Sequence, residues 1–502
     1  MDNDKFPLRA HKNVVETEEF LSNDFEARAK KYKEYEEAAI KLNNLVFDTK
    51  DLPFYIHSFQ IHGTQKTRRS LFESVIYPAL QARTLGSVID EVRITADKLN
   101  RLDIFKHVDV LLDNSNDPFA QPGAIDVILS AEEKSRFWIK TGTEIGNDAG
   151  SANISLNVRN VFGGAETLET YMSAGTQTSY VFEFCLAKPI NGNPDSKVDI
   201  SAYRLTRNNQ SFSSHDEILQ GIALRWRVLS KLGFHELTYG TSWRQICNIA
   251  SDATLRHIII LFFKKTYAIC LILFNQLFIF MNFSIRESAG HSLKSSVTHT
   301  LVRDMRDDIM LPSRGYYVKL FQEFAGFNGD VYFAKNEFES QINFPLGKGF
   351  ILSASLRNGL LFPFKTHQSK ISDRFFLGGA QSVRGFKLNG IGPRENKKDS
   401  LGGDVYVAAG VSLFTPLPKL TKYPVKGHFF VNGGSLVQIN SSRRLAQSIH
   451  NLTKTPSVSA GVGVVYRSSI LRLEVNFCLP LIATNTDKLK KGLQLGLGFN
   501  FW

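Results

Sequence analysis

Most of this chain alternates between apolar and polar residues with a period of two. The end of the chain is the clearest case: Leu493, Leu495, Leu497, Phe499 and Phe501 share one face, and Gln494, Gly496, Gly498 and Asn500 share the other. Successive side chains of a β-strand point to opposite faces, so this period predicts strands that are apolar on one side only.

About sixteen segments of this kind follow residue 134, an even number, as in single-chain bacterial membrane barrels. They cover residues 135–146, 150–161, 165–175, 178–188, 196–206, 217–230, 233–249, 284–302, 315–324, 331–344, 348–361, 401–415, 426–437, 456–466, 470–479 and 491–502. Soluble sandwiches alternate too, so the period alone does not choose between the two architectures. Polar faces rich in Lys, Arg, Glu, Asn and Gly, aromatic residues near strand ends, and apolar faces of about 9–11 residues favour a transmembrane β-barrel over residues 134–502.

The first part of the chain follows other periods. Residues 1–52 are polar and mix Glu with Lys at helical spacings, which predicts a solvated helical arm. Residues 53–133 read as strand, helix, helix, strand and strand. This order predicts a small α+β domain in front of the barrel.

Two stretches interrupt the strands. Residues 256–283 are almost continuously apolar but contain Lys264, Lys265, Asn275 and Gln276, so they make a poor transmembrane helix. Their richness in Ile, Leu, Phe, Lys and Asn, which A/T-rich codons encode, points to translated non-coding sequence from a faulty gene model. Residues 362–401 form a glycine-rich connection that is longer than an ordinary loop and too apolar for disorder, which indicates a functional loop.

Composition narrows the class further. The 502 residues carry a net charge of +12, and only 22% of them are charged. A mean hydropathy of −0.14 excludes a polytopic helical membrane protein but allows a barrel with an inward polar face. The four cysteines are far apart, which suggests neither a disulfide framework nor a zinc ribbon. The polar opening lacks the apolar run of a secretory signal peptide.

No motif for chemistry emerges. His235 and Glu236 begin an H-E-x-x-H pattern, but Tyr239 stands at the second histidine, so zinc is rejected. The sequence has no phosphate-binding loop, dinucleotide fingerprint or nucleophile elbow. The basic residues are spread over strands and loops and do not form a nucleic-acid-binding stripe. We therefore expect no enzymatic activity, no cofactor or metal, and no nucleic-acid partner.

The long loop carries a recognisable motif. The run Arg374-Phe375-Phe376-Leu377-Gly378-Gly379 is followed by Ser382-Val383-Arg384-Gly385-Phe386. This combination resembles the signature loop of the outer-membrane barrel-assembly insertase superfamily, whose tip folds back into the barrel. The segment Arg286 to Ser296, together with Ile391-Gly392-Pro393 and Leu401-Gly402-Gly403, is similar to its mitochondrial branch, the core barrel subunits of the sorting and assembly machinery. The resemblance covers about residues 50–502 except 256–283, and it implies that residues 53–133 are a polypeptide-transport-associated domain.

The resemblance implies roles for the loop residues. Arg384 would lie inside the barrel and need acceptors on its wall, because an unpaired buried charge is costly. Asp404 matches one such partner, and Asn432 stands where the family has a second acidic partner, so a neutral hydrogen bond would replace that ion pair. Gly385 would allow a tight turn at the tip and Phe386 would wedge against the wall. A loop that merely plugs and stabilises the barrel is the alternative.

A lateral gate between the first and last strands is the second site that the resemblance implies. It would comprise Ile139, Thr141, Gly142 and Gly146 on the first strand, and Gly496 and Gly498 on the last. The glycines would weaken packing along this seam, although they could also serve only to fit a crowded lumen. Gln494, Gly496, Phe499 and Phe501 match the spacing of the mitochondrial β-signal, which marks barrel precursors.

The function implied by the resemblance is the folding and insertion of β-barrel precursors into the mitochondrial outer membrane, by templated strand pairing at the gate. The implied partners are these precursors, other subunits of the sorting and assembly complex, and the lipid bilayer. The small domain would face the intermembrane space. An outer-membrane pore or polypeptide-translocating channel is the alternative that shares the same fold.

Overall fold

The computed structural model describes residues 48–498, apart from 116, 147–148, 177, 250–284, 286–287, 365–368, 396–398, 419–422, 440–449, 451, 453, 455 and 469–471, and also Lys33 and Lys41. The chain divides into two compact units, Met1–Lys134 and Ser135–Trp502. Nearly all of the predicted arm, and the whole apolar stretch 256–283, lie outside the described residues. The ideas of a helical arm and of a gene-model artefact therefore stay predictions.

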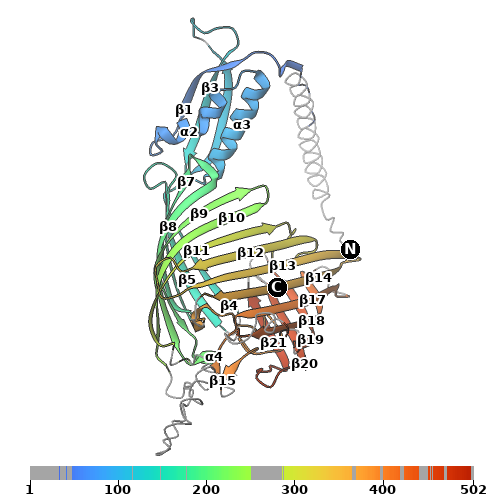
Figure 1. Ribbon diagram of the computed structural model, residues 1–502. Coiled ribbons are helices and arrows are strands. Elements are labelled where there is room, and N and C mark those ends of the chain that lie inside the picture. The colour runs from blue at the N-terminus through green and yellow to red at the C-terminus, as the bar shows by residue number, and fades with distance from the viewer. Residues whose placement is uncertain are drawn as a thin grey trace, which may run out of the picture. The chain divides into compact units, whose positions relative to one another are not determined.

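The first unit is the predicted α+β fold. Its elements are β1 (Tyr55–His62), α2 (Arg69–Leu80), α3 (Leu85–Arg101), β2 (Phe105–Asn114) and β3 (Ala124–Glu133) (Figure 1). The sheet has the order β1-β3-β2, with β1 parallel to β3 and β2 antiparallel to it. Thr84 and Ser87 form a capping box that starts α3. A core that includes Ala79, Val88 and Val127 joins both helices to one face of the sheet.

The second unit is a sixteen-stranded sheet. Strands that are neighbours in the order below pair with each other, and each pair is antiparallel. Its strands are β4 (Phe137–Gly146), β5 (Ala149–Arg159), β6 (Thr167–Gly175), β7 (Thr178–Ile190), β8 (Asn193–Asn208), β9 (Asp216–Ser230), β10 (Gly233–Cys247), β11 (Gly290–Asp304), β12 (Gly315–Ala325), β13 (Phe333–Gly347), β14 (Phe350–Pro363), β17 (Val405–Pro416), β18 (Val425–Val437), β19 (Ser457–Arg467), β20 (Arg472–Ile482) and β21 (Gly492–Gly498). The number and direction of the predicted strands are confirmed.

One strand boundary differs clearly from its prediction. The segment 284–302 was expected to be strand throughout, but β11 begins only at Gly290. The backbone N–H of Ser288 donates to the carbonyl of Ile285, at 3.2 Å, and closes a turn just before the strand. This local hydrogen bond takes the place of strand pairing at Ile285 and Ser288, and residues 284 and 286–287 lie outside the described residues.

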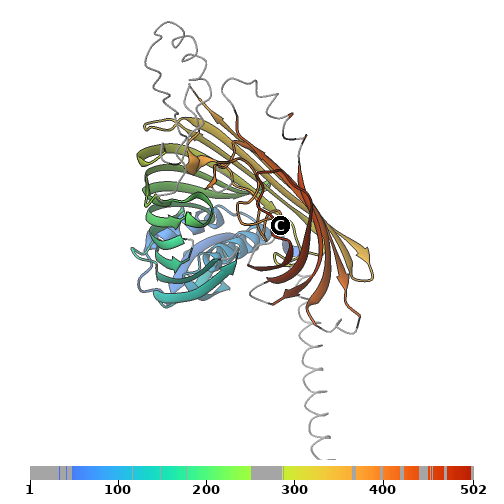
Figure 2. The ribbon, with the colours of Figure 1, turned by 90° about the horizontal axis from the view of Figure 1, so that it is seen from below.

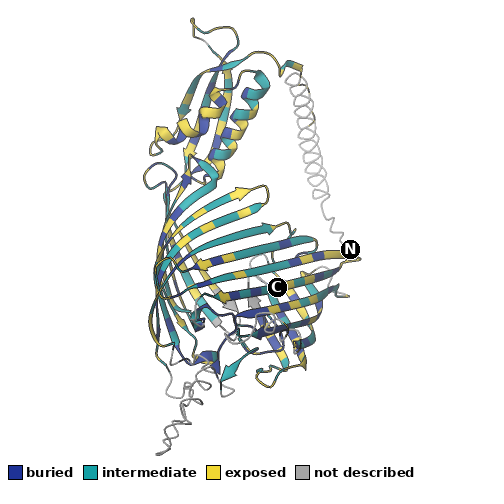
Figure 3. Cartoon of the chain, in the orientation of Figure 1, coloured by how far each residue is buried: buried dark blue, intermediate teal, exposed yellow. Residues whose placement is uncertain are grey.

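Side chains alternate across the sheet as predicted. Phe477, Leu479 and Leu481 on one face of β20 are more than half exposed, whereas Glu474, Asn476 and Cys478 on its other face are buried. Figure 3 shows exposed positions recurring along the strands. The outward face is therefore apolar and the polar face is enclosed, the arrangement of a transmembrane barrel. The helices among the described residues are each too short or too polar to cross a membrane.

The long connection between β14 and β17 lies against the concave side of this sheet, which we call the lumen (Figure 2). It contains the short helical turn η2 (Ile371–Asp373) and the small strands β15 (Arg394–Glu395) and β16 (Asp399–Ser400). Its tip belongs to a buried cluster with the strand residues Phe333, Leu361, Tyr406 and Leu436. The tip of the loop is therefore buried in an apolar core that it shares with the barrel wall.

Candidate functional site: the lumen loop and the barrel seam

Arg374 closes the base of the loop. Its guanidinium donates to the hydroxyl and the carbonyl of Ser369, both at 2.8 Å, and to the carbonyl of Leu401 at 3.0 Å. Phe375 and Gly403 exchange backbone hydrogen bonds of 2.8 and 2.9 Å beside it. One buried arginine thus ties together the entry and the exit of the loop.

Asp373 joins the loop to the lumen wall. Its carboxylate oxygen lies 2.8 Å from Arg244 Nη1 on β10 and 3.4 Å from Lys294 Nζ on β11. Lys335 Nζ on β13 donates to the Asp373 carbonyl at 3.1 Å. These three strands therefore hold the loop at one wall.

Arg384, at the tip, is bound near the carboxyl-terminal end of the sheet, on β20. Its Nη2 and Nε donate to one carboxylate oxygen of Glu474 at 2.9 and 3.2 Å. The guanidinium also lies 5.2 Å from the centre of the Phe430 ring. Both side chains of the ion pair are buried, so the charges are compensated by each other and not by water.

Glu474 serves a second arginine. Its other carboxylate oxygen accepts from Arg472, and Asn476 Nδ2 donates to the same oxygen as Arg384, at 2.9 Å. Two buried guanidinium groups therefore share one carboxylate. Glu474 was not singled out from the sequence as a partner of Arg384. The available signal was an acidic residue on the polar face of a predicted strand, between Leu473 and Val475.

The predicted Arg384–Asp404 pair is wrong in this structure. The Asp404 carboxylate accepts from the Ser369 hydroxyl at 2.5 Å and from the backbone N–H of Ile439 at 2.9 Å, and lies 4.0 Å from Arg374 Nε. Asp404 immediately precedes β17 at the loop base, where Arg374 lies, whereas the tip reaches across to β20. Spacing along the chain could not distinguish these two arginines.

Asn432 contacts the motif through an intermediate and not by direct contact with the guanidinium. Its Oδ1 lies 2.6 Å from the Ser459 hydroxyl, which also contacts the carbonyl oxygen of Arg384. The expected neutral hydrogen bonding at this position is present, but it supports the loop backbone.

Gly385 and Phe386 are clamped by the last strand. Gln494 Oε1 accepts from the Gly385 N–H at 3.0 Å, and its Nε2 donates to the Phe386 carbonyl at 3.3 Å. Gly385 has φ +83°, and a Cβ there would lie 2.9 Å from Ser459 Cβ. The predicted need for glycine at the tip thus has two causes, the left-handed backbone and the close wall. Phe386 and Val383 are almost completely buried.

The turn before β21 supports the loop as well. Lys387 N–H donates to the Lys488 carbonyl at 2.9 Å, Lys488 N–H donates to the Gly390 carbonyl at 2.8 Å, and Lys490 N–H donates to the Gly385 carbonyl at 2.9 Å. These are backbone contacts, which carry no sequence signature, so they could not be predicted. The preceding glycines of the motif shape the turn: Gly378 and Gly379 have φ +113° and +124°.

The predicted gate residues lie on the two end strands of the sheet. β4 pairs with β5 and β21 pairs with β20, and no ladder joins β4 to β21 among the described residues. Their Cα atoms nevertheless approach within 8 Å. Ile139 and Thr141 are exposed on β4, Gly142 and Gly146 lie on the same strand, and Gly496 and Gly498 lie on β21. Over residues 137–146 and 492–498, two strand edges therefore come close to each other without forming a ladder.

The β-signal pattern is only partly visible. Gln494 is buried and Gly496 lies on β21, whereas Phe499 and Phe501 lie outside the described residues. The part of the chain that the structure describes brings together no group of three or more His, Cys, Asp or Glu side chains that could hold a metal ion.

Comparison with known proteins identifies the family. Residues 160–501 match the Omp85 superfamily domain. The chain is 32% identical over 479 residues to a SAM50-like protein of Schizosaccharomyces pombe, covering 93% of this chain and 94% of that protein. It is 34% identical over 467 residues to the sorting and assembly machinery component 50 homolog B of Xenopus laevis, covering 91% of this chain and 92% of that protein.

A solved structure agrees on the fold. BamA from Haemophilus ducreyi lacking POTRA domains 1–3 superposes with a TM-score of 0.70 at 14% identity, covering 89% of this chain and 84% of that one. With its two-unit fold, its buried Arg384 loop and these relatives, the chain belongs to the Omp85 superfamily and, within it, to the sorting and assembly machinery component 50 family.

Proposed function

We propose that this protein folds β-barrel precursors and inserts them into the mitochondrial outer membrane at the seam between β4 and β21. The observation that carries the proposal is the seam itself, a sheet of sixteen strands whose end strands lie close together without a described ladder. The names of the relatives, components of the sorting and assembly machinery, support the same activity.

The physical basis is the cost of unpaired backbone in lipid. Each backbone N–H and C=O that enters hydrocarbon without a partner costs several kcal/mol, on the order of the group's desolvation penalty. β4 is ten residues long, and its edge that pairs with no described strand offers a row of such partners. A strand of about 9–11 residues spans the membrane, so β4 can template one client strand by β-augmentation.

The loop gives the two sides of the seam different roles. Gln494 on β21 is tied to the tip, and Glu474 on the neighbouring β20 is tied to Arg384. The loop therefore keeps the carboxyl-terminal edge of the sheet in place while β4 accepts the client. In this proposal Arg384 maintains the gate and takes no part in covalent chemistry, so the activity is non-enzymatic.

The proposed activity requires a particular membrane and particular partners. The barrel lies in the mitochondrial outer membrane, the amino-terminal polypeptide-transport-associated domain faces the intermembrane space, and the protein works with other subunits of the sorting and assembly complex. Its clients are β-barrel precursors, and its surroundings are the lipid bilayer.

Import of a labelled porin precursor into mitochondria depleted of this protein tests the function. We expect the precursor to cross the outer membrane and remain unassembled, and re-expression of the wild-type chain to restore the folded, membrane-integrated form. Normal porin assembly in depleted mitochondria would exclude the insertase function. Voltage-dependent conductance in lipid bilayers, together with normal porin assembly, would instead support the pore or channel.

A further inference from the structure

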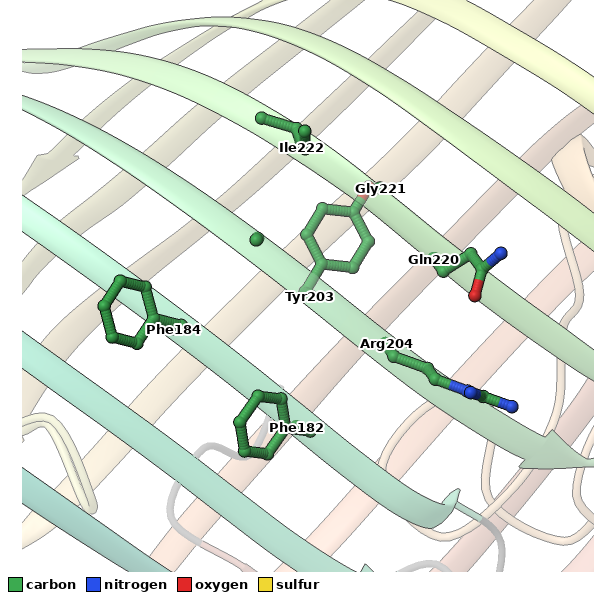
Figure 4. Close-up of a pocket in the computed structure, with 8 residues that line it drawn as sticks. Phe182, Phe184, Tyr203, Arg204, Gln220, Gly221 and Ile222 are labelled. Carbon is green, nitrogen blue, oxygen red and sulfur yellow. The ribbon is translucent and has the colours of Figure 1, made fainter.

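The outward surface of β7, β8 and β9 contains a polar pair within an apolar band. Phe182, Arg204 and Gln220 lie side by side in register on the three strands. On β8, Asp199 and Ser201 are buried toward the lumen, and Arg204 lies on the alternate set of positions. Arg204 therefore points away from the lumen. Figure 4 shows that Arg204 and Gln220 extend in the same direction from adjacent strands.

Arg204 and Gln220 have no polar partner within the described part of the chain, because neither makes a hydrogen bond or an ion pair there. The lumen face of the same strands is different: Arg225 donates to Glu183, Asp199 and Ser201, each at 2.7 Å. Acidic and hydroxyl groups thus satisfy Arg225 in the lumen, whereas the outward Arg204 is available to a ligand. A guanidinium at the edge of hydrocarbon is costly unless an anion or water satisfies it.

A groove of about 340 Å³ lies beside the pair. Phe182, Phe184 and Ile222 give it an apolar lining (Figure 4). Ala202 lies in register between Phe184 and Ile222, and its small side chain leaves the groove open. The three large apolar side chains are exposed on the outer surface. The groove is therefore open to the acyl-chain side of the membrane.

The depth of the pair suits a lipid headgroup. β8 has 16 residues and β9 has 15, whereas about 9–11 residues cross the hydrocarbon. The strands therefore extend beyond it, and their ends lie at headgroup level. Arg204 stands four positions before Asn208, the end of β8, and Gln220 four positions after Asp216, the start of β9. Both lie toward the same rim, within reach of that interface.

We propose that this surface binds an anionic phospholipid. The lipid phosphate accepts hydrogen bonds from the Arg204 guanidinium and the Gln220 amide, and one acyl chain lies over Phe182, Phe184 and Ile222. Arginine suits this role because its planar donors match phosphate oxygens, and a lipid such as phosphatidylglycerol has no ammonium group of its own to pair with that phosphate. The site requires only the outward face of the barrel and does not depend on the proposed insertase activity.

Lipid retention by the full-length protein tests the site. The folded protein is reconstituted in nanodiscs of phosphatidylcholine with a minority of phosphatidylglycerol, released into detergent and weighed by native mass spectrometry. We expect bound phosphatidylglycerol on the wild type and about tenfold lower occupancy in Arg204→Gln, the change that corresponds to about 1.4 kcal/mol. Arg204→Lys keeps the charge but loses the fork of donors, so its occupancy lies between the two.

Two further variants separate a built site from general attraction. Ala202→Trp fills the groove while leaving Arg204 in place, so we expect it also to lose the lipid. Arg303→Gln is the matched control. Arg303 also points outward, and its guanidinium carbon lies 5.7 Å from the centre of the Tyr316 ring. It lies one residue before the end of β11, near the opposite rim of the barrel. A heat-induced mobility shift on gels verifies that each variant is folded.

Three results would overturn the proposal. The first is equal phosphatidylglycerol retention by wild type and Arg204→Gln, and the second is an equal loss in Arg303→Gln. The third is undiminished retention in Ala202→Trp, which would reduce the site to a surface charge.

Discussion

Glu474 is the residue on which two buried arginines depend. Replacing it with Gln leaves Arg384 and Arg472 without their shared carboxylate, whereas Arg384→Ala leaves Glu474 still paired with Arg472. Because uncompensated buried charges cost about 3–5 kcal/mol, we expect Glu474→Gln to destabilise the folded barrel more than Arg384→Ala. The midpoint of the heat-induced gel mobility shift measures this order, and the reverse order would disprove the shared-carboxylate account.

The Arg384→Ala variant distinguishes a role of Arg384 in the gate from a role in folding of the barrel. The strand ladders do not involve this side chain, so we expect the variant to fold and insert but to assemble imported porin more slowly than wild type. Arg384→Lys, which keeps a charge near Glu474, is the matched control and should retain part of the rate. A normal assembly rate in Arg384→Ala would remove Arg384 from the gate mechanism.

Gly385 and Gly347 form a matched pair of left-handed glycines. Both have positive φ, +83° and +88°, but a Cβ at Gly347 meets nothing within 4 Å, whereas one at Gly385 comes within 2.9 Å of Ser459 Cβ. Alanine at either position incurs a backbone cost of about 1–2 kcal/mol, and only Gly385→Ala adds a steric clash. We expect Gly385→Ala alone to reduce porin assembly strongly; equal effects of the two variants would show that backbone strain accounts for everything.

At the scale of elements, the loop and the last strand form one unit. Gln494→Leu removes the acceptor of the Gly385 N–H and the donor to the Phe386 carbonyl. Each buried backbone group left unpaired costs about 1–3 kcal/mol, so we expect the tip to loosen. Faster tryptic cleavage after Arg384 or Lys387 in the folded, detergent-solubilised protein measures this. Gln322→Leu, on β12 and away from the loop, should leave cleavage unchanged, and unaltered cleavage in Gln494→Leu would disprove the clamp.

In the amino-terminal unit, Glu133 on β3 holds the residues that precede α2. Partial burial opposes its ionisation, but hydrogen bonds from the Thr67 hydroxyl and from the backbone N–H groups of Thr67 and Lys66 outweigh burial and hold the pKa of Glu133 below its ordinary value. A lowered pKa in the folded state adds stability above the unfolded-state pKa, and that stability is lost as the pH falls through the folded-state pKa.

Glu133→Gln should therefore destabilise this unit at neutral pH and lose that effect in acid. Hydrogen exchange of β3 amides in the full-length protein, measured at neutral pH and below the ordinary glutamate pKa of 4.5, compares variant and wild type. Glu91→Gln on α3 is the control, because the Glu91 carboxylate makes no hydrogen bond or ion pair within the described residues. A difference between wild type and Glu133→Gln that persists unchanged in acid would contradict this role.

At the scale of the whole molecule, the seam is the part of the barrel that must open. A scan of cysteine pairs places one cysteine at an outward position of β4, such as Ile139 or Thr141, and one at an outward position of β21, such as Leu493 or Leu495. Oxidation then identifies a pair that joins the two strands. We expect oxidation of a correctly registered pair to block porin assembly and a reductant to restore it. The same pair shifted to β5 and β6, at Ile154 and Met172, joins strands that are already in register and should not block assembly. Assembly at the normal rate with a closed seam would exclude a lateral gate.

The sequence alone determined the strands, their number and the small domain, because period-two and helical patterns are local and repeat along each element. Burial confirms this for Gln494, a polar residue between the exposed Leu493 and Leu495. It also singled out the Arg384 loop through a motif of neighbouring residues. These features depend on side chains that are close together in the chain.

Only the tertiary structure decided which lumen groups meet. Arg384 and Glu474 are separated by 90 positions, and Arg374 and Asp404 both lie near the base of the loop, so either arginine could have been assigned to either acid. The choice depends on how far the loop reaches across the barrel. The same reason hid the backbone clamp by Gln494 and the outward guanidinium of Arg204, which has no polar partner among the residues that the structure describes. A pairing, or its absence, is a property of distances in space, which no local pattern of residues contains.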